Sequence, residues 1–363
     1  MEKDRKDGNK NTGRAKRVKA KKMVLLVGCA VLAAALTSGC GSKKEMEEVH
    51  IGYFNNVTHA QALYMKAEGM LDEVFGEGVE VKWTAFNAGP SEVEALFAGD
   101  IDIGYIGPVP AITANVKSDG DVLILSGATM AGAELVTSPD SAIESAADLD
   151  GKTVAVPQIG NTQHLCLLKL LSDNGLAPAE AGGTVTVTAV ENADVQNMMD
   201  QGNIDAALVP EPWGAMLTES GAKIVLDYDE VYAGGDYPVA VVVVRKDFLE
   251  ENPESVSVFL KKHEEATKAV QTDTDAAAAI VNEEITAATG KSLIPSVLKS
   301  AFEKIVVSEK VNRDAVEDFA KIALEQGFIA ENYEEIFSDI EGQEQTAEVS
   351  DKGLYMKTAH KGR

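Results

Sequence analysis

The sequence contains little cysteine and, beyond its first 39 residues, little arginine, so it has few of the side chains that form disulfides, zinc sites or bidentate anion-binding sites. Cysteine occurs three times in 363 residues, at positions 29, 40 and 166, and no cysteine–histidine cluster has the spacing of a zinc site. Beyond residue 39, arginine occurs only at positions 245, 313 and 363. Bidentate hydrogen bonding to a carboxylate or phosphate usually needs arginine. The scarcity of arginine therefore argues against a doubly charged ligand held by arginine side chains.

Common catalytic signatures are also missing. The Gly-x-Ser-x-Gly elbow, the P-loop and the His-Glu-x-x-His motif do not occur. The five histidines form no spaced motif with cysteine or serine, and the many acidic residues show no recognisable metal-ligand spacing. We therefore expect no catalytic residues and no metal site, and an enzyme is only a minor alternative.

The charge balance is strongly acidic. The formal net charge is −25, while the hydrophobic content of 45% and the charged content of 25% are those of an ordinary globular protein. An acidic chain is poorly suited to nucleic acid or to an anionic membrane surface, so we expect no nucleic-acid partner. The length is sufficient for about two domains.

Residues 1–39 have the pattern of an export signal. They carry ten Lys or Arg against three Asp or Glu, and an apolar run from Val24 to Leu36 follows the basic part. This run is too short to favour a membrane-spanning helix. The junction before Cys40 resembles the lipobox of bacterial lipoproteins, which predicts a lipidated Cys40 and a tether over residues 40–48. A plain secretory signal or an uncleaved anchor is the alternative. Cys166 is then the one thiol of the mature chain, and we expect it to be a buried small apolar residue.

Short apolar strands alternate with helical stretches from residue 49 onward, which indicates an α/β fold with largely parallel sheets. The chain from Val256 to about Phe337 has mostly helical periodicity, and no sustained apolar period follows Ile340. We therefore predict a mobile tail over residues 341–363. The expected strands are 49–54, 79–86, 101–107, 122–128, 133–138, 153–157, 184–190, 204–210, 222–227 and 237–245.

Two passages of the sequence are alike. "AGDIDIGYIGPVPA" (98–111) and "QGNIDAALVPEPWGA" (201–215) each have a helix-ending glycine, an Ile-Asp pair, an apolar strand and a loop that contains proline. Two similar units indicate a two-lobe design, in which each lobe places a loop at the carboxyl end of a strand. Ligands of open α/β sheets bind at that edge.

In this order the segments also resemble a known family. "IGYFNNVTHAQALYMKAEG", "FNAGPSEVEALFAGDIDIGYIGPVPAI", "DLDGKTVAVPQIGNTQHLCLLKLL", "GNIDAALVPEPW" and "YPVAVVVVRKDFLEENPE" are similar to the solute-binding proteins of nitrate/sulfonate/taurine-type ABC importers. The resemblance covers residues 49 to about 335.

The resemblance implies a type II periplasmic-binding-protein-like fold, in which each lobe is a mixed, mostly parallel sheet flanked by helices. Lobe one would comprise residues 49–130 and 237–340, and lobe two residues 131–236, with the ligand in the cleft between them. It also implies a protein with no cofactor that delivers a small-molecule solute to an ABC permease and its ATPase; the oligomeric state is left open, with a monomer assumed. The lipid on Cys40 would anchor it to the outer face of the cell membrane.

The candidate ligand-binding residues of lobe one lie in three loops that precede helices. Neutral side chains and free N–H groups at a helix start attract anions, although capping of the helix is an equally plausible role for Asn56 and Thr58. Gly89 and Gly107 allow close approach of the backbone. The candidates are Asn55, Asn56, Thr58, His59, Asn87, Gly89 and Gly107.

Lobe two contributes a second set, which begins in "PQIGNTQH". The matching family positions commonly contact ligand, so Asn161 and Thr162 are the leading candidates. Glu211 is a possible acceptor, and Trp213 is either an apolar wall or a packed helix-start aromatic. Tyr237 either reaches the cleft or packs at the hinge. The complete set is Gly160, Asn161, Thr162, Gln163, Glu211, Trp213 and Tyr237.

The predicted ligand is a small organic anion or zwitterion. The candidate loops hold neutral donors and no arginine, which suits a monoanion such as a sulfonate or a taurine-like solute. A thiamine-precursor pyrimidine, nitrate and bicarbonate are the alternatives, and a tethered sensor is a weaker one.

Overall fold

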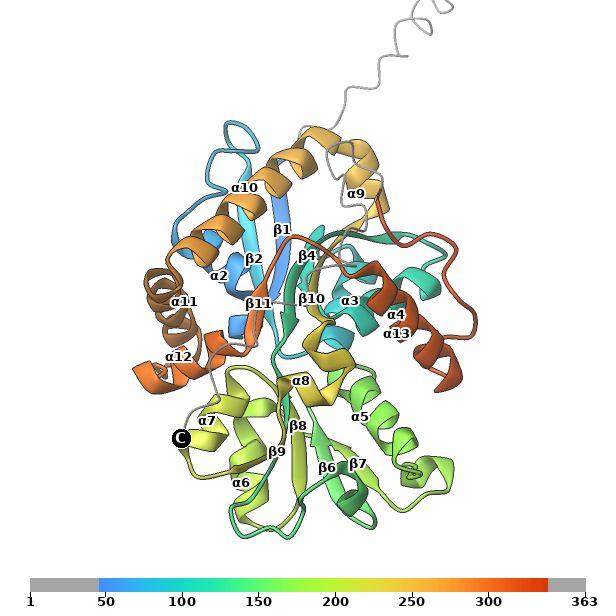
Figure 1. The fold of residues 1–363 in the computed structure, drawn as a ribbon. Helices are drawn as coiled ribbons and strands as arrows, with labels where there is room; N and C mark the ends of the chain where they lie inside the picture. The colour runs from blue at the N-terminus through green and yellow to red at the C-terminus, as the bar shows by residue number, and fades with distance from the viewer. Residues whose placement is uncertain (1–45, 339–363) are drawn as a thin grey trace, which may run out of the picture. The chain divides into compact units, whose positions relative to one another are not determined.

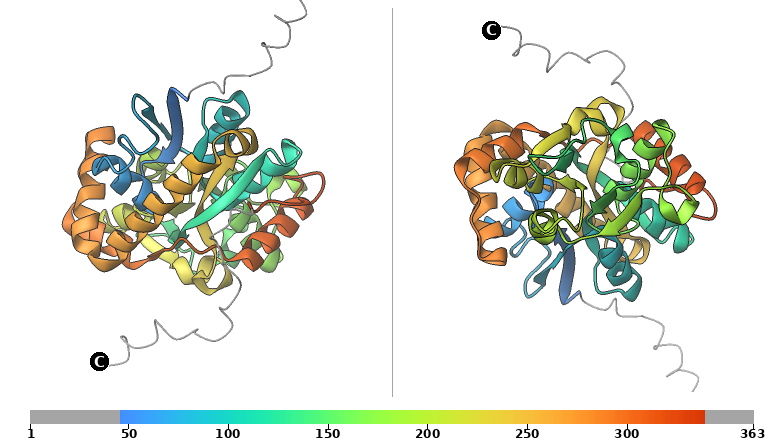
Figure 2. Two further views of the ribbon diagram at one scale, coloured as in Figure 1. Left: turned by 90° about the horizontal axis from the view of Figure 1, so that it is seen from above. Right: turned by 90° about the horizontal axis from the view of Figure 1, so that it is seen from below.

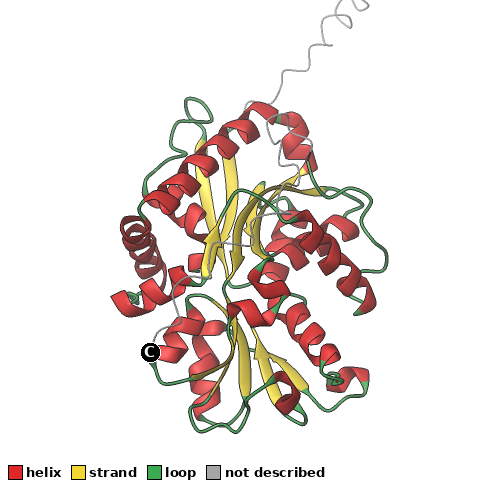
Figure 3. Ribbon diagram, in the orientation of Figure 1, coloured by secondary structure: helices red, strands yellow, loops and turns green. Residues whose placement is uncertain are grey.

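Two β-sheets form the centre of the protein in a computed structural model that describes residues 46–338 (Figures 1 and 3). The predictions for the export signal, Cys40, most of the tether and the tail from residue 341 lie outside the described residues. The chain divides at Met46, and everything below concerns the unit that begins at Glu47.

The first sheet has six strands in the order β11-β4-β10-β3-β1-β2. Strand β3 pairs in parallel with β1, which pairs in parallel with β2, while β10 is antiparallel to both β3 and β4. Four of the six strands therefore run in the same direction. The strands are β1 Glu48–Phe54, β2 Glu80–Phe86, β3 Ile103–Ile106, β4 Val122–Ala131, β10 Pro238–Arg245 and β11 Ile305–Val307.

The second sheet has five strands in the order β7-β6-β8-β5-β9. Its strand β6 is parallel to β7 and β8, and β5 is antiparallel to both β8 and β9, so four of the five strands run in the same direction. Both sheets are thus mixed, which confirms the predicted two-lobe α/β fold class. Most strands of each sheet share one direction, but only two of the five neighbouring pairs in the first sheet and two of the four in the second are parallel. The strands are β5 Ala133–Thr137, β6 Thr153–Val156, β7 Thr186–Ala189, β8 Ala206–Pro210 and β9 Lys223–Leu226.

Helices cover both faces of each sheet. In the views from above and below, α10 and α11 lie on one side and α13 lies on the opposite side (Figure 2). In the described part of the chain, no helix is both long and apolar enough to cross a membrane. The α-helices are α2 Ala60–Ala67, α3 Gly89–Ala98, α4 Pro108–Lys117, α5 Thr162–Asp173, α6 Val195–Asp200, α7 Trp213–Glu219, α8 Tyr228–Val231, α9 Lys246–Glu251, α10 Pro253–Thr272, α11 Thr274–Thr289, α12 Pro295–Glu303 and α13 Arg313–Glu325. The 3₁₀ helices are η1 Val57–His59, η2 Ala146–Leu149, η3 Ala179–Ala181, η4 Asn192–Asp194 and η5 Ala233–Gly235.

The chain changes sheets twice. It leaves the first sheet at Ala131 and enters the second at Ala133, and it returns between β9 and β10. We call the structure around the first sheet lobe one and that around the second sheet lobe two; the exact residues assigned to each lobe stay a prediction. Cys166 is a free, buried thiol on α5, as expected.

Strand β11 and helix α9 are among the elements that the sequence patterns missed. Strand β11 lies in the region that was expected to be helical, where the short run Ile305–Val307 pairs antiparallel with the end of β4. Three residues are too few to show a period, so only the neighbouring strand identifies them. Helix α9 occupies the segment after Arg245, where only a turn was expected.

A buried carboxyl group lies beneath the first sheet. Glu92 projects from α3 and is fully buried, and neither carboxylate oxygen has a hydrogen-bond partner among residues 46–338. Gly52 and Gly104, which are paired between β1 and β3, leave the space for it, since a Cβ on either would overlap its Oε1. Burial raises the pKa of Glu92 well above its usual 4.5.

We expect Glu92→Gln to make stability less dependent on pH. The folded-state pKa of Glu92 is raised, so wild-type stability falls as pH rises from 4.5 toward that pKa, because only the unfolded chain ionises there. Urea unfolding from about pH 5 to about pH 8 measures this slope, and the variant should lose less stability than wild type. Glu94→Gln, on the exposed face of the same helix, is the matched control. Identical slopes for all three proteins would contradict the assignment.

Candidate ligand-binding site

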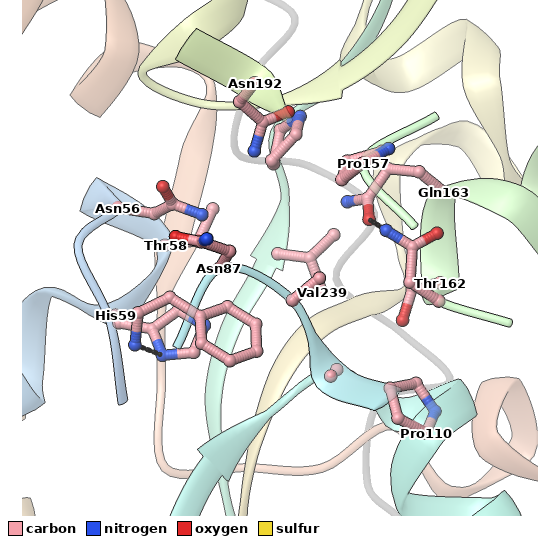
Figure 4. Close-up of a pocket in the computed structure, with 16 residues that line it drawn as sticks. Asn56, Thr58, His59, Asn87, Pro110, Pro157, Thr162, Gln163, Asn192 and Val239 are labelled. Atoms are coloured by element: carbon pink, nitrogen blue, oxygen red, sulfur yellow. Dashed lines mark hydrogen bonds between the residues drawn. The ribbon is translucent and has the colours of Figure 1, made fainter. Parts of the chain in front are cut away.

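A small cavity lies between the two lobes, at the ends of their parallel strands. Nine of the predicted residues line it: Asn56, Thr58, His59, Asn87, Gly89, Gly107, Asn161, Thr162 and Gln163. Figure 4 shows Asn56, Thr58 and Asn87 on one side of this space and Thr162 and Gln163 on the other. The remaining lining residues are Phe54, Ala88, Pro110, Pro157, Asn192, Pro210 and Val239.

Four helices begin at this cavity. The residue before each helix, or its first residue, is among the lining residues, at η1–α2, α3, α4 and α5. The first N–H groups of a helix have no partner within the helix, and the dipole leaves a partial positive charge at that end. Such a convergence favours a negatively charged group in the cavity.

The start of α5 combines helix capping with free polar groups. Asn161 caps the helix, since its Oδ1 accepts a hydrogen bond from the His164 N–H at 2.8 Å. Its Nδ2 donates to Gln163 Oε1 at 3.1 Å, and the Gln163 amide nitrogen points toward the cavity (Figure 4). The buried Thr162 hydroxyl has no hydrogen-bond partner among the described residues. This hydroxyl and the Gln163 amide are therefore available to a ligand.

His59 lies on the other side of the cavity and is neutral. Its ring stacks on Phe54 at 4.3 Å, and its Nδ1 accepts a hydrogen bond from the Phe54 N–H at 3.2 Å. Burial lowers the pKa of His59 to about 3. None of the 16 lining residues is Lys, Arg, Asp or Glu. The cavity thus offers dipoles and neutral donors in place of an ion pair.

The two lobes touch across the cavity. Trp213 Nε1 of lobe two donates to Asn56 Oδ1 of lobe one at 2.9 Å. Asn87 Nδ2 donates to Glu191 Oε1 at 3.3 Å. A Cβ at Gly107 would overlap the Thr162 hydroxyl, so glycine is needed where the lobes meet. These contacts indicate a closed arrangement of the lobes.

Five predicted residues lie outside the cavity. Asn55 and Trp213 line a neighbouring cavity. Gly160 has a φ of +87°, which accounts for glycine at this turn. Tyr237 is buried and its ring packs against Tyr232 and Phe319. Glu211 is buried beside Lys304, with 3.3 Å between its Oε1 and the lysine Nζ.

Asn192 is the polar lining residue that the sequence analysis missed. It follows β7, and its side chain points into the cavity from the side of lobe two (Figure 4). The rule that ligands bind at the carboxyl ends of strands applies to it as it does to Asn161. Asn192 is the one asparagine in "VENADV", and it was therefore less conspicuous than the polar run "GNTQH". In the part of the chain that the structure describes, no group of three or more His, Cys, Asp or Glu is arranged to hold a metal ion.

Comparisons with known proteins agree with this geometry. The sequence profile of the NMT1-like family matches residues 42–284. The taurine-binding periplasmic protein of Escherichia coli (strain K12) is 35% identical over 185 residues, which are 51% of this chain and 55% of that protein. The match thus spans about half the length of this relative. A putative aliphatic sulfonates-binding protein of Bacillus subtilis (strain 168) is 27% identical over 65% of this chain and 68% of its own length.

A solved structure shares the fold. The alkanesulfonate-binding protein SsuA from Xanthomonas axonopodis pv. citri, bound to MOPS, superimposes with a TM-score of 0.66 at 21% identity. The superposition covers 78% of this chain and 95% of that protein. The fold is therefore that of periplasmic binding proteins, with two lobes and a cleft between them.

Proposed function

This chain belongs to the NMT1-like family, and from that premise we propose that it is an extracytoplasmic solute-binding protein that captures a small sulfonate or taurine-like ligand. It performs no reaction and passes the ligand to an ABC permease and its ATPase. The observation that carries the proposal is the interlobe cavity, where four helices begin and where no charged side chain lines the space. The taurine- and sulfonate-binding relatives support the choice of ligand.

The proposal extends to the attachment of the protein. A lipid on Cys40 would hold it on the outer face of the cell membrane, with the residues before β1 as the tether. Metabolic labelling with a fatty acid tests this point, because Cys40→Ala should abolish the label. A label that persists in Cys40→Ala would contradict it.

A thermal-shift panel tests the ligand. A solute that binds only the folded protein raises its melting temperature. We expect taurine and short alkanesulfonates to raise it more than nitrate, bicarbonate or a pyrimidine does. Mass spectrometry of small molecules that copurify with the protein identifies the natural ligand independently. A flat response to every solute would overturn the proposal, and a response to nitrate alone would transfer the site to that anion.

The contact between Trp213 and Asn56 should contribute to affinity by favouring closure. Trp213→Phe removes the indole N–H that donates across the cavity, and a net loss of about 1 kcal/mol corresponds to about fivefold weaker binding. Calorimetric titration with taurine measures the change. The chain has two tryptophans, so Trp83→Phe in β2, outside both cavities, is the matched control. Equal affinities for the two variants would exclude this role.

A further inference from the structure

A second and larger cavity lies beside the ligand cavity. It has a volume of about 210 Å³ and lies between α7, the start of α6 and the junction of α11 and α12. Figure 1 shows α12 next to α7, and these two helices are in contact. One wall is apolar, with Trp213, Met216, Leu217, Ile285 and Leu293. An alkyl chain in this space would therefore contact apolar side chains from both lobes.

The two cavities are neighbours that share residues. Asn192 lines both of them. Asn55 lines the second cavity, and the adjacent Asn56 lines the first. The indole of Trp213 faces the second cavity while its Nε1 binds Asn56. The two cavities therefore lie next to each other at these residues.

Two acceptors at this junction are unused. Asn55 Oδ1 and Asn192 Oδ1 are buried, and neither has a hydrogen-bond partner among residues 46–338. Leaving a buried acceptor unpaired costs free energy, so a donor on the ligand would be favoured there. An N–H group on the ligand has this chemistry, because it is a donor that either amide oxygen can accept from.

We propose that the second cavity is a binding site for the tail of the ligand, and that the ligand class is an N-acylated aminosulfonate. The sulfonate lies in the first cavity at the helix starts, the amide lies at Asn55 and Asn192, and the alkyl chain packs along Trp213. This inference rests on the proposed function, because it places the head group in the sulfonate site. It predicts that taurine is a weaker ligand than its acylated forms.

Calorimetric titration of the full-length protein with taurine and N-hexanoyltaurine tests the tail site. We expect the acylated probe to bind about tenfold more tightly, since burial of a few methylene groups suffices for that gain. Met216→Trp fills the second cavity and should bring the ratio of the two dissociation constants close to one. If Met216→Trp does not fold, Ser220→Trp replaces it as the variant that fills the cavity, because Ser220 is exposed and also lines it. Thr218→Trp, exposed on the same helix and outside both cavities, should leave the ratio unchanged.

A second pair of probes tests the N–H group. An alkanesulfonate of the same chain length as N-hexanoyltaurine lacks the amide, and we expect it to bind several-fold more weakly than the amide. Asn55→Ala should remove that preference, because it deletes one of the two unused acceptors. Equal binding of the two long probes to wild type would contradict the amide assignment.

The outcomes separate this inference from the proposed function. If taurine and N-hexanoyltaurine bind equally and Met216→Trp changes nothing, the tail site is wrong and the sulfonate site stands. If neither probe binds while another solute of the thermal-shift panel does, the proposed ligand class is wrong and the tail site falls with it.

Discussion

Lys304→Met is expected to lower the free energy of unfolding by about 3 kcal/mol or more, the largest effect on stability that we predict. Lys304 follows α12 in lobe one, and its ammonium group pairs with Glu134 of β5 and with Glu211, which follows β8. Both carboxylate side chains are fully buried. Removal of this cation leaves Glu134 and Glu211 buried next to each other without the charge that stabilises their ionised forms. Urea unfolding at neutral pH measures the loss.

The pH dependence of this loss has a definite sign. Burial and the neighbouring Glu211 raise the pKa of Glu134 from 4.5 to about 8. The unfolded chain ionises at the lower pH, so this group makes the folded state less stable as pH rises from 4.5 to about 8. Without Lys304 the pKa of Glu134 rises further, so the fall in stability should continue to a higher pH than in the wild type.

Two variants control the experiment. Lys299→Met, within α12 itself, removes an exposed lysine whose Nζ is 3.8 Å from Glu303 Oε1 and should change stability by about 0.5 kcal/mol or less. Adding Glu134→Gln to Lys304→Met should recover part of the lost stability, because one buried acid is gone. If Lys299→Met and Lys304→Met lower the free energy of unfolding by equally small amounts, the contacts of Lys304 with Glu134 and Glu211 do not stabilise the fold.

Binding should be most sensitive to the start of α5. The double substitution Asn161→Ala and Thr162→Val is expected to weaken binding of taurine by about tenfold or more, since each lost buried hydrogen bond is worth about 1 kcal/mol. Thr162→Val keeps the shape of the side chain and removes only the hydroxyl that has no protein partner in the described structure. Asn161→Ala removes the amide that positions Gln163. Calorimetric titration measures the affinity.

The capping role of Asn161 needs its own control. Loss of this cap costs about 1 kcal/mol of stability in addition to any effect on the ligand. Asn312 caps α13 in the same way, since its Oδ1 accepts a hydrogen bond from the Ala315 N–H at 3.0 Å. Asn312→Ala removes this cap, which lines neither cavity. It should lower stability by a similar amount and leave affinity unchanged. An unchanged affinity in the α5 variant would remove Asn161 and Thr162 from the site.

The sequence by itself determined the class of fold and most of the loops that meet at the cavity. Apolar runs with period two and helices that end in glycine are local patterns, and they placed most of the strands within a few residues. Ligands of open α/β sheets bind at the carboxyl ends of the strands, and this rule selected the loops that contain Asn56, Asn87 and Asn161. All three residues line the interlobe cavity.

Only the tertiary structure decided which side chain of a loop faces which space. Asn55 and Asn56 are adjacent, yet they line different cavities, because successive side chains of an extended chain point in opposite directions. Glu211 had the pattern of a ligand acceptor, but Lys304, far along the sequence, pairs with it in the interior. Local periodicity carries no information about such distant partners, since they meet only when the lobes pack against each other.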